Sequence, residues 1–178
     1  MPDISAPEIV LIAAMTRSDR VIGCNGKLPW PPIPEDMERF KTRTLGHPVL
    51  MGGRTWREDL NQVPLPGRIH IVVSTQAVQV AEAKPEPIAF TSLEKALEWI
   101  HQQPWPRVYI LGGGSIYTQT LPQADTLDLT LIEADYKGDI FFPAYEHLIG
   151  SQFYEAERQE RQGFSFVIYR RIDQGSLK

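Results

Sequence analysis

Short apolar runs rich in valine, isoleucine and aromatic residues recur along the chain, and they predict β-strands. Most runs are continuous rather than alternating, which is typical of strands covered on both faces of a sheet. The last two runs alternate, as Leu127, Leu129 and Leu131 show, and this favours an antiparallel pair near a sheet edge. The predicted strands span residues 9–14, 48–51, 69–74, 88–90, 107–111, 126–134 and 164–172.

Helical segments lie between these runs. Ser92 is the expected N-cap of a helix over residues 92–100, and a further helix spans 115–121. Strands that alternate with helices indicate an α/β domain with a mostly parallel sheet, which the two antiparallel strands complete. The first helix, residues 35–45, carries one stripe at helical spacing, formed by Met37, Phe40, Thr44 and Leu45.

Charge and cysteine content exclude several classes of function. The net charge is −4, without the basic excess or stripe of nucleic-acid-binding proteins, so no nucleic-acid partner is expected. The longest apolar run, residues 9–15, is far too short to span a membrane, and the first residues lack the features of a secretory signal. Cys24 is the only cysteine, so no internal disulfide and no metal site are expected. We therefore predict a cytoplasmic protein.

Three glycines, Gly112, Gly113 and Gly114, follow a predicted strand and precede a helix. At such a junction, backbone N–H groups can approach a phosphate, whose charge the helix N-terminus favours. The dinucleotide-binding fingerprint needs a further glycine where Tyr117 stands, so the segment is not a Rossmann motif. The alternative interpretation is a tight turn that requires positive φ.

The loop of residues 21–30 contains two glycines and Trp30, a composition that suits a lid over a cleft. An ordinary surface loop whose tryptophan anchors in the core is the alternative. After the loop, Asp36 borders the helical stripe, whereas Glu35 lies further around the helix from that stripe. A carboxylate beside an apolar cleft can bind an amino-heterocycle through paired N–H···O contacts, although acids in a first turn usually only complement the helix dipole.

Potential anion donors follow other predicted strands and turns. Arg68 comes after the rigid turn 63–67 and offers a planar fork for a carboxylate or phosphate, unless it is simply solvated. Residues 52–55 follow one strand, and Ser74 with Thr75 follows the next. Because ligands bind at the carboxyl ends of strands in open α/β sheets, we expect these segments to lie together.

Taken in order, these segments resemble the dihydrofolate reductase family over nearly the whole chain, from residue 9 to residue 171. Each segment alone is weak evidence, but their shared order and spacing make the set highly specific. The segments are Ile12-Ala13-Ala14, Asp19-Arg20-Val21-Ile22-Gly23, Leu28-Pro29-Trp30, Pro34-Glu35-Asp36-Met37-x-x-Phe40-Lys41, residues 44–52, Thr55-Trp56, Pro64-Leu65-Pro66-Gly67-Arg68, Gly112-Gly113-Gly114-x-Ile116-Tyr117, Thr130 and Gly138-Asp139-x-x-Phe142-Pro143.

The resemblance implies a single domain over residues 1–178, with an eight-stranded, mostly parallel central sheet, an antiparallel C-terminal edge strand and about four flanking helices. It also implies a monomeric enzyme that uses NADPH to reduce 7,8-dihydrofolate to tetrahydrofolate and that binds antifolate inhibitors. Hydride is expected to reach pterin C6, while N5 takes a proton from solvent. Residues 1–8 and 173–178 fall outside the resemblance and are expected to be frayed.

Residue roles follow from the same resemblance. Asp36, the only carboxylate of the pterin pocket, is expected to hold the 2-amino group and N3, with Thr130 joining through water and Arg68 clamping the glutamate α-carboxylate. Trp30 and Tyr117 are also assigned to the catalytic site. The substrate is expected against Ile12, Met37, Phe40, Leu65 and Leu111. The expected cofactor contacts are Ala14, Ile22, Gly23, Leu28, Gly53, Arg54, Thr55, Ser74, Thr75, Gly112, Gly113, Gly114, Ser115 and Ile116, with a cis bond after Gly112.

Some positions depart from the family pattern. Gly53 stands where the family usually has arginine, so we expect Arg54, Ser74 and Thr75 to hold the 2′-phosphate, with a less secure preference for NADPH over NADH. Leu111 stands where isoleucine or valine is common, and this raises the hypothesis of trimethoprim insensitivity. Two alternatives stay open: a reductase of the same fold that acts on a ribosylamino-pyrimidine, and a non-catalytic nucleotide-binding module.

Overall fold

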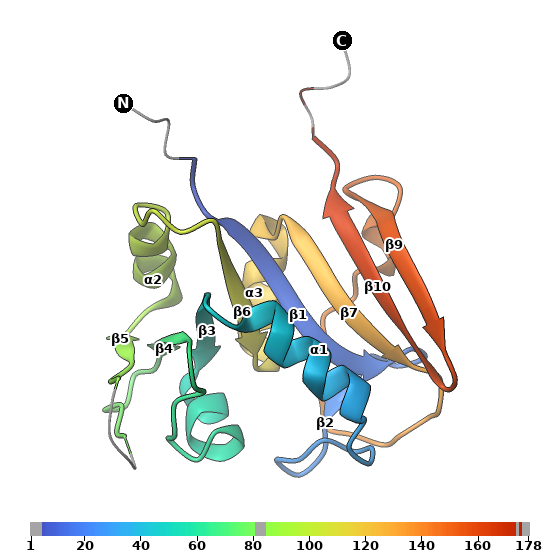
Figure 1. Cartoon of the computed structure of the whole chain (residues 1–178), viewed down its shortest axis with the longest axis horizontal. Helices are drawn as coiled ribbons and strands as arrows, with labels where there is room; N and C mark the ends of the chain where they lie inside the picture. The colour runs from blue at the N-terminus through green and yellow to red at the C-terminus, as the bar shows by residue number, and fades with distance from the viewer. Residues whose placement is uncertain (1–4, 81–84, 174, 176–178) are drawn as a thin grey trace.

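The computed structural model describes residues 5–80, 85–173 and 175 (Figure 1). Its main sheet consists of β1 (Glu8–Thr16), β3 (Pro48–Gly52), β4 (Ile69–Val73), β5 (Ile88–Phe90), β6 (Arg107–Gly112), β7 (Thr126–Ile132), β9 (Phe153–Arg161) and β10 (Phe164–Arg171). The eight strands are ordered β5-β4-β3-β6-β1-β7-β10-β9. Those from β5 to β7 are parallel, β10 is antiparallel to β7, and β9 is antiparallel to β10. The expected α/β fold is confirmed.

One edge of the sheet is β9, a strand that the hydrophobic pattern does not predict, and the other edge is β5. Its sequence is rich in charged residues, and most of its side chains are exposed. Charge on an edge strand discourages pairing with other chains, so such a strand lacks the apolar signal of a buried one. The predicted antiparallel pair is β7 with β10, but β7 is buried along its whole length.

Helices cover both faces of the sheet, as Figure 1 shows for α1 in front and α3 behind. Alternate residues of β1 point to opposite faces. Leu11 belongs to an apolar cluster with residues of α2 and α3, whereas Val10 and Ile12 belong to a second cluster with Trp56 of η1, against which Phe40 of α1 packs. The helices are α1 (Pro34–Thr44), the short π-helix η1 (Thr55–Asp59), α2 (Leu93–Ile100), α3 (Gly114–Thr120) and the 3₁₀ turns η2 (Leu121–Gln123) and η3 (Glu146–Leu148).

The predicted stripe of α1 is only partly buried. Thr44 is buried and Phe40 packs against the second cluster, but Met37 and Leu45 are 60% and 50% exposed. Apolar surface therefore stays open on this helix.

The other helix boundaries agree with the sequence pattern. Oγ of Ser92 accepts a hydrogen bond from the backbone N–H of Lys95 at 3.2 Å, which confirms the N-cap of α2. Glu8, expected to be frayed, instead begins β1 and accepts a hydrogen bond from Oγ1 of Thr126 at 2.6 Å. The same expectation for residues 1–4, 174 and 176–178 lies outside the described residues. No helix in the described part of the chain has the length and apolarity needed to cross a membrane.

Candidate active site

Three segments predicted to bind the cofactor meet at the carboxyl ends of β3, β4 and β6. A Cβ atom on Gly52 would lie 3.9 Å from the carbonyl oxygen of Gly112, and one on Gly113 would lie 3.6 Å from Oγ1 of Thr55. Ser74, directly after β4, approaches Gly53. The expected clustering is confirmed for residues 52–55 and Ser74, at the edge where open α/β sheets bind ligands. It is wrong for Arg68, which directly precedes β4 and therefore lies at the amino end of that strand.

The conformation at Gly112 requires glycine. Its φ of +104° is one that other residues rarely adopt, and an added Cβ would lie only 2.7 Å from the ring of Tyr117. The tight-turn interpretation is therefore confirmed for Gly112, whereas Gly113 has an ordinary φ of −75°. The peptide bond between the two glycines is cis, as expected.

Gly53 leaves a space that two polar groups fill. A Cβ atom there would lie 2.6 Å from Oγ of Ser74 and 2.9 Å from Nη1 of Arg57. Arg54, the cation predicted for this place, is exposed and forms an ion pair with Glu58 at 2.9 Å. No sequence motif singles out Arg57, because only the helical turn of η1 brings it back over Gly53.

Asp36 and Thr130 are joined directly. Oγ1 of Thr130 donates a hydrogen bond to Oδ1 of Asp36 across 2.6 Å. Asp36 is half-buried, and this burial raises its pKa above the usual 3.8, although the bond from Thr130 and the charge of Arg39 oppose the rise. Glu35 lies at the surface and pairs with Arg161 at 2.6 Å. The different placement expected for the two acids is confirmed.

A second acid, Asp128, lies beside this pair. It precedes Thr130 by two positions on β7, so both side chains leave the same face of the strand. Its side chain is 3% exposed, and its charge raises the pKa of Asp36 further. The sequence pattern does not assign this neighbour to the site, and Asp36 as the only carboxylate of a pterin pocket stays a prediction. The only sequence signal of Asp128 is that it is an aspartate inside an otherwise apolar strand.

Three residues assigned to the substrate share the second apolar cluster. Ile12 is buried in it, and Phe40 and Leu111 pack against it. Leu65 is half-buried in the loop before β4, and Met37 leaves its side chain exposed on α1. Apolar groups of this kind beside a few fixed polar groups are typical of a small-molecule site.

Arg68 is buried, contrary to the alternative of a solvated side chain. Its Nε donates to Oγ1 of Thr44 at 2.8 Å, and its Nη1 donates to the carbonyl oxygen of Pro66 at 2.6 Å. Nη2 donates more weakly to the carbonyl oxygen of Lys41 at 3.3 Å. No carboxylate of the described residues forms an ion pair with it, and burial lowers the pKa of Arg68. This positive charge is well suited to a carboxylate ligand.

The loop predicted to be a lid is held at both ends. It begins in β2 (Val21–Gly23), which pairs with β8 (Ile140–Phe141) in a second small sheet. Trp30, at its end, is buried with its ring edge-on to Tyr136, 6.1 Å between centroids. Leu28 is 62% exposed. The tryptophan therefore anchors the loop, while apolar surface remains free near its tip.

Tyr117 belongs to the apolar cluster under α3, on the opposite face of the sheet from α1. Its hydroxyl donates a hydrogen bond to the carbonyl oxygen of Ile12 at 2.7 Å, and burial raises its pKa. The hydroxyl is thus neutral and already engaged with the backbone. Its catalytic assignment stays a prediction.

The remaining predicted cofactor contacts surround the same strand ends or the lid. Ile116 is buried in the cluster under α3, and its side chain reaches Gly52, where an added Cβ would lie 3.2 Å from its Cγ1. A Cβ on Gly114 would lie 3.1 Å from the carbonyl oxygen of Phe141, which brings β8 close to α3. Ala14 and Ile22 are half-buried, Gly23 pairs with Ile140, and Thr75 and Ser115 are exposed.

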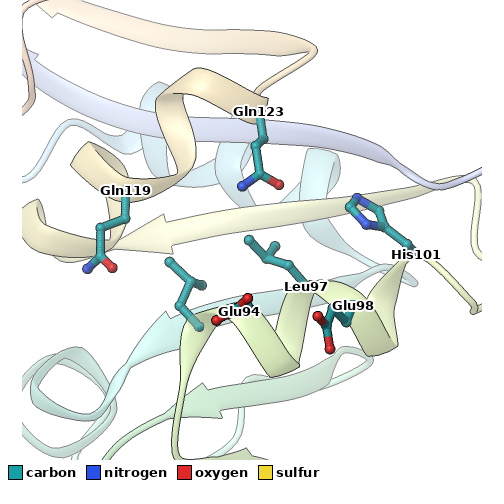
Figure 2. A pocket seen from close by; sticks show the side chains of 7 residues that line it. Glu94, Leu97, Glu98, His101, Gln119 and Gln123 are labelled. Carbon is teal, nitrogen blue, oxygen red and sulfur yellow. The ribbon is translucent and has the colours of Figure 1, made fainter.

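The pocket in Figure 2 lies elsewhere, between α2 and the segment α3–η2. None of the predicted site residues lines it. Within the described ranges, no group of three or more histidine, cysteine, aspartate or glutamate side chains is arranged to hold a metal ion. The lining residues are Leu93, Glu94, Leu97, Glu98, His101, Gln119 and Gln123.

The fold is an α/β fold in which segments after three parallel strands meet at their carboxyl ends, and it also joins the half-buried Asp36 of α1 to Thr130 of β7. The family model described as dihydrofolate reductase matches residues 8–171. The chain therefore belongs to the dihydrofolate reductase family.

Individual relatives agree with this assignment. The chain is 42% identical to the dihydrofolate reductase of Neisseria meningitidis serogroup A over 170 residues, which cover 92% of this chain and 98% of that protein. It is 36% identical to dihydrofolate reductase HdrB of Haloferax volcanii over 173 residues, or 94% and 85% of the two chains. The solved dihydrofolate reductase of Enterococcus faecalis, complexed with NADP(H) and RAB-propyl, superposes with a TM-score of 0.77 at 25% identity and covers 93% of this chain and 97% of its own.

Proposed function

We propose that this chain reduces 7,8-dihydrofolate to 5,6,7,8-tetrahydrofolate with NADPH, as a cytoplasmic monomer. The observation that carries the proposal is the hydrogen bond between Thr130 and the half-buried Asp36. Family membership supplies the reaction class, and this pair supplies a carboxylate suited to a pterin.

Asp36 orients the substrate. Thr130 occupies one lone pair of Oδ1, which leaves acceptor capacity on both carboxylate oxygens for two parallel N–H donors. The pterin 2-amino group and N3 present such a pair. Thr130 extends the same network toward the pterin through water. Because Asp36 is engaged at this edge of the ring, N5 takes its proton from solvent, and Asp36 contributes orientation and charge.

The strand ends fit NADPH. The space at Gly53 is bordered by the Ser74 hydroxyl and by Arg57, two donors suited to the 2′-phosphate. Backbone N–H groups at the start of α3, in Gly114 and Ser115, suit the diphosphate. When bound, NADPH supplies the hydride that reduces pterin C6.

Arg68 binds the glutamate end of the substrate. Its side chain is held by Thr44 and by backbone carbonyls, so the guanidinium is oriented before a carboxylate arrives. The lid loop, anchored by Trp30, covers the reacting rings and excludes water, with Leu28 as its apolar contact.

The test is NADPH oxidation by the purified chain with dihydrofolate as substrate. Asp36→Asn is expected to lower turnover by roughly 10²–10⁴, in the range of a lost acid–base or orienting group. The matched control is Glu35→Gln, which changes the neighbouring but exposed acid and leaves turnover near wild type. Oxidation with a ribosylamino-pyrimidine but not with dihydrofolate would assign the chain to the alternative reductase, and no oxidation with either would favour a non-catalytic module.

We also infer reduced sensitivity to trimethoprim. Leu111 packs against the cluster that contains Ile12, next to the proposed pterin site, and its shape differs from that of isoleucine or valine. The measurement is inhibition of the purified enzyme beside a trimethoprim-sensitive bacterial enzyme. Equal inhibition of the two contradicts the inference. Light scattering of the same preparation tests the monomer.

A further inference from the structure

A buried ion pair lies between α1 and β7, next to the Asp36–Thr130 hydrogen bond. Nη1 of Arg39 is 2.5 Å from Oδ1 of Asp128, in a close approach of charges rather than an aligned hydrogen bond. Nε of Arg43 is 3.6 Å from Oδ2 of the same aspartate. Because Asp128 is almost fully buried, solvent and salt screen this pair less than a surface ion pair.

The ion pair and the Asp36–Thr130 hydrogen bond link the same two elements side by side. Asp36 and Arg39 are three residues apart and share a face of α1. Asp128 and Thr130 are two residues apart and share a face of β7. A rotation or slide of the helix by one residue would break both links together, so each link supports the other.

The apolar packing of α1 comes from Phe40, which packs against the second apolar cluster, and polar contacts hold the helix beside it. The buried side chain of the helix is Thr44, and Met37 points to solvent. Arg39 itself packs on the ring of Phe166 in β10, with its guanidinium carbon 4.6 Å from the ring centroid. The position of the helix therefore also depends on charged side chains.

We propose that Arg39 and Asp128 are positioning residues for Asp36. Their ion pair holds α1 against β7 so that the Asp36 carboxylate stays bonded to Thr130, and their opposite charges balance around that carboxylate. The inference rests on the proposed function, in which Asp36 orients the substrate.

The charges around Asp36 allow a specific test. Arg39 lowers the pKa of Asp36 and Asp128 raises it. Removing one of the two charges leaves the other unbalanced, whereas removing both changes the surroundings of Asp36 little. The neighbouring groups are Arg39 on α1, Thr130 and Asp128 on β7, the uncharged Phe166 on β10 and, at the surface, the Arg161–Glu35 pair.

The experiment follows the carboxyl titration of Asp36 by carbon NMR in the ligand-free protein, with the signal assigned by Asp36→Asn. We expect Arg39→Gln to raise the midpoint by roughly one pH unit and Asp128→Asn to lower it by less. The double variant is expected close to wild type. Shifts in the same direction, or no shift in either single variant, would overturn the proposal.

A matched control removes an exposed ion pair that links the same helix to β9. Arg161→Gln frees Glu35, and it is expected to leave the Asp36 titration in place because surface pairs contribute little. If a single variant does not fold, the double variant carries the test, since replacing both members of a buried pair is commonly tolerated. A double variant displaced as far as either single variant contradicts the balance of charges.

Kinetics separate this proposal from the proposed function. The pH dependence of kcat/KM for dihydrofolate is expected to move with each NMR midpoint. If the midpoints move in opposite directions but the chain does not reduce dihydrofolate, the proposed function fails and the charge balance stands. If the chain reduces dihydrofolate and the midpoints do not move, the proposed function stands and the charge balance fails.

Discussion

Arg68 donates its Nε hydrogen to Oγ1 of Thr44, 2.8 Å away, and so ties the loop before β4 to the last turn of α1. The same Thr44 oxygen donates to the carbonyl oxygen of Phe40 at 2.8 Å. The helix that carries Asp36 at its start therefore holds Arg68 at its end. One rigid helix, α1, therefore sets the distance between Asp36 and Arg68, which we propose bind the two ends of the substrate.

Arg68→Lys is expected to raise KM for dihydrofolate roughly tenfold to a hundredfold while kcat changes little. A lysine cannot form the two parallel hydrogen bonds of a guanidinium fork, and a remote clamp supplies uniform binding energy. Steady-state kinetics measure both constants. A matched control is Arg17→Lys, in an exposed ion pair with Glu133. A fall confined to kcat contradicts the clamp.

Thr44→Val is expected to raise KM for dihydrofolate severalfold, because Nε of Arg68 loses its acceptor and the fork is no longer fixed. The change also leaves a buried donor unsatisfied, which costs about 1–3 kcal/mol of unfolding free energy. Thr44→Ser keeps the hydroxyl and is expected to restore KM. If serine fails to restore it, the hydroxyl is not the group that matters.

Asp36→Asn is expected to increase the free energy of unfolding at neutral pH, although it removes activity. Burial raises the pKa of Asp36, so the folded state holds its proton more tightly than the unfolded state. Wild-type stability therefore falls as pH rises from 3.8 through the folded pKa, and the variant lacks this loss. Denaturant unfolding at several pH values measures the difference. A variant less stable than wild type at neutral pH contradicts the sign.

His70 is expected to make the enzyme less stable in mild acid. Its Nε2 accepts a hydrogen bond from the backbone N–H of Leu65 at 3.0 Å, and burial lowers its pKa below 6.5. The stability that the neutral His70 imidazole contributes to the fold is therefore fully present above pH 6.5. It is lost as the pH falls through the folded pKa. His70→Gln keeps an acceptor without titrating, so its unfolding free energy is expected to vary less across this range. If the unfolding free energies of wild type and His70→Gln varied in parallel with pH, this role of His70 would be refuted.

Arg57→Gln is expected to weaken NADPH more than NADH, because Arg57 borders the space at Gly53 together with Ser74. The expected rise in KM for NADPH is roughly tenfold, the effect of one lost charge-assisted contact. Arg54→Gln is the comparison, since that side chain is exposed and paired with Glu58. A larger effect at Arg54 would indicate that Arg54, the residue predicted from the sequence, holds the 2′-phosphate.

The local sequence pattern predicted those elements whose burial or boundary shows in their own residues. Continuous apolar runs identified β1 and β3. The Ser92 cap located α2, and helical spacing separated Asp36 from Glu35. It did not predict β9, because a charged edge strand is stabilised by its partner rather than by an apolar face.

By itself, the sequence determined the α/β fold, the glycine segment at the end of β6 and the acid at position 36, since each depends on residues that are neighbours along the chain. Only the tertiary structure decided that Thr130 meets Asp36 across 94 positions, that Asp128 lies beside them, and that Arg57 and Ser74 both approach Gly53. Such contacts depend on how a helix is placed against a strand. Periodicity tells which face of an element is turned inward, but not which residue of the next element it meets.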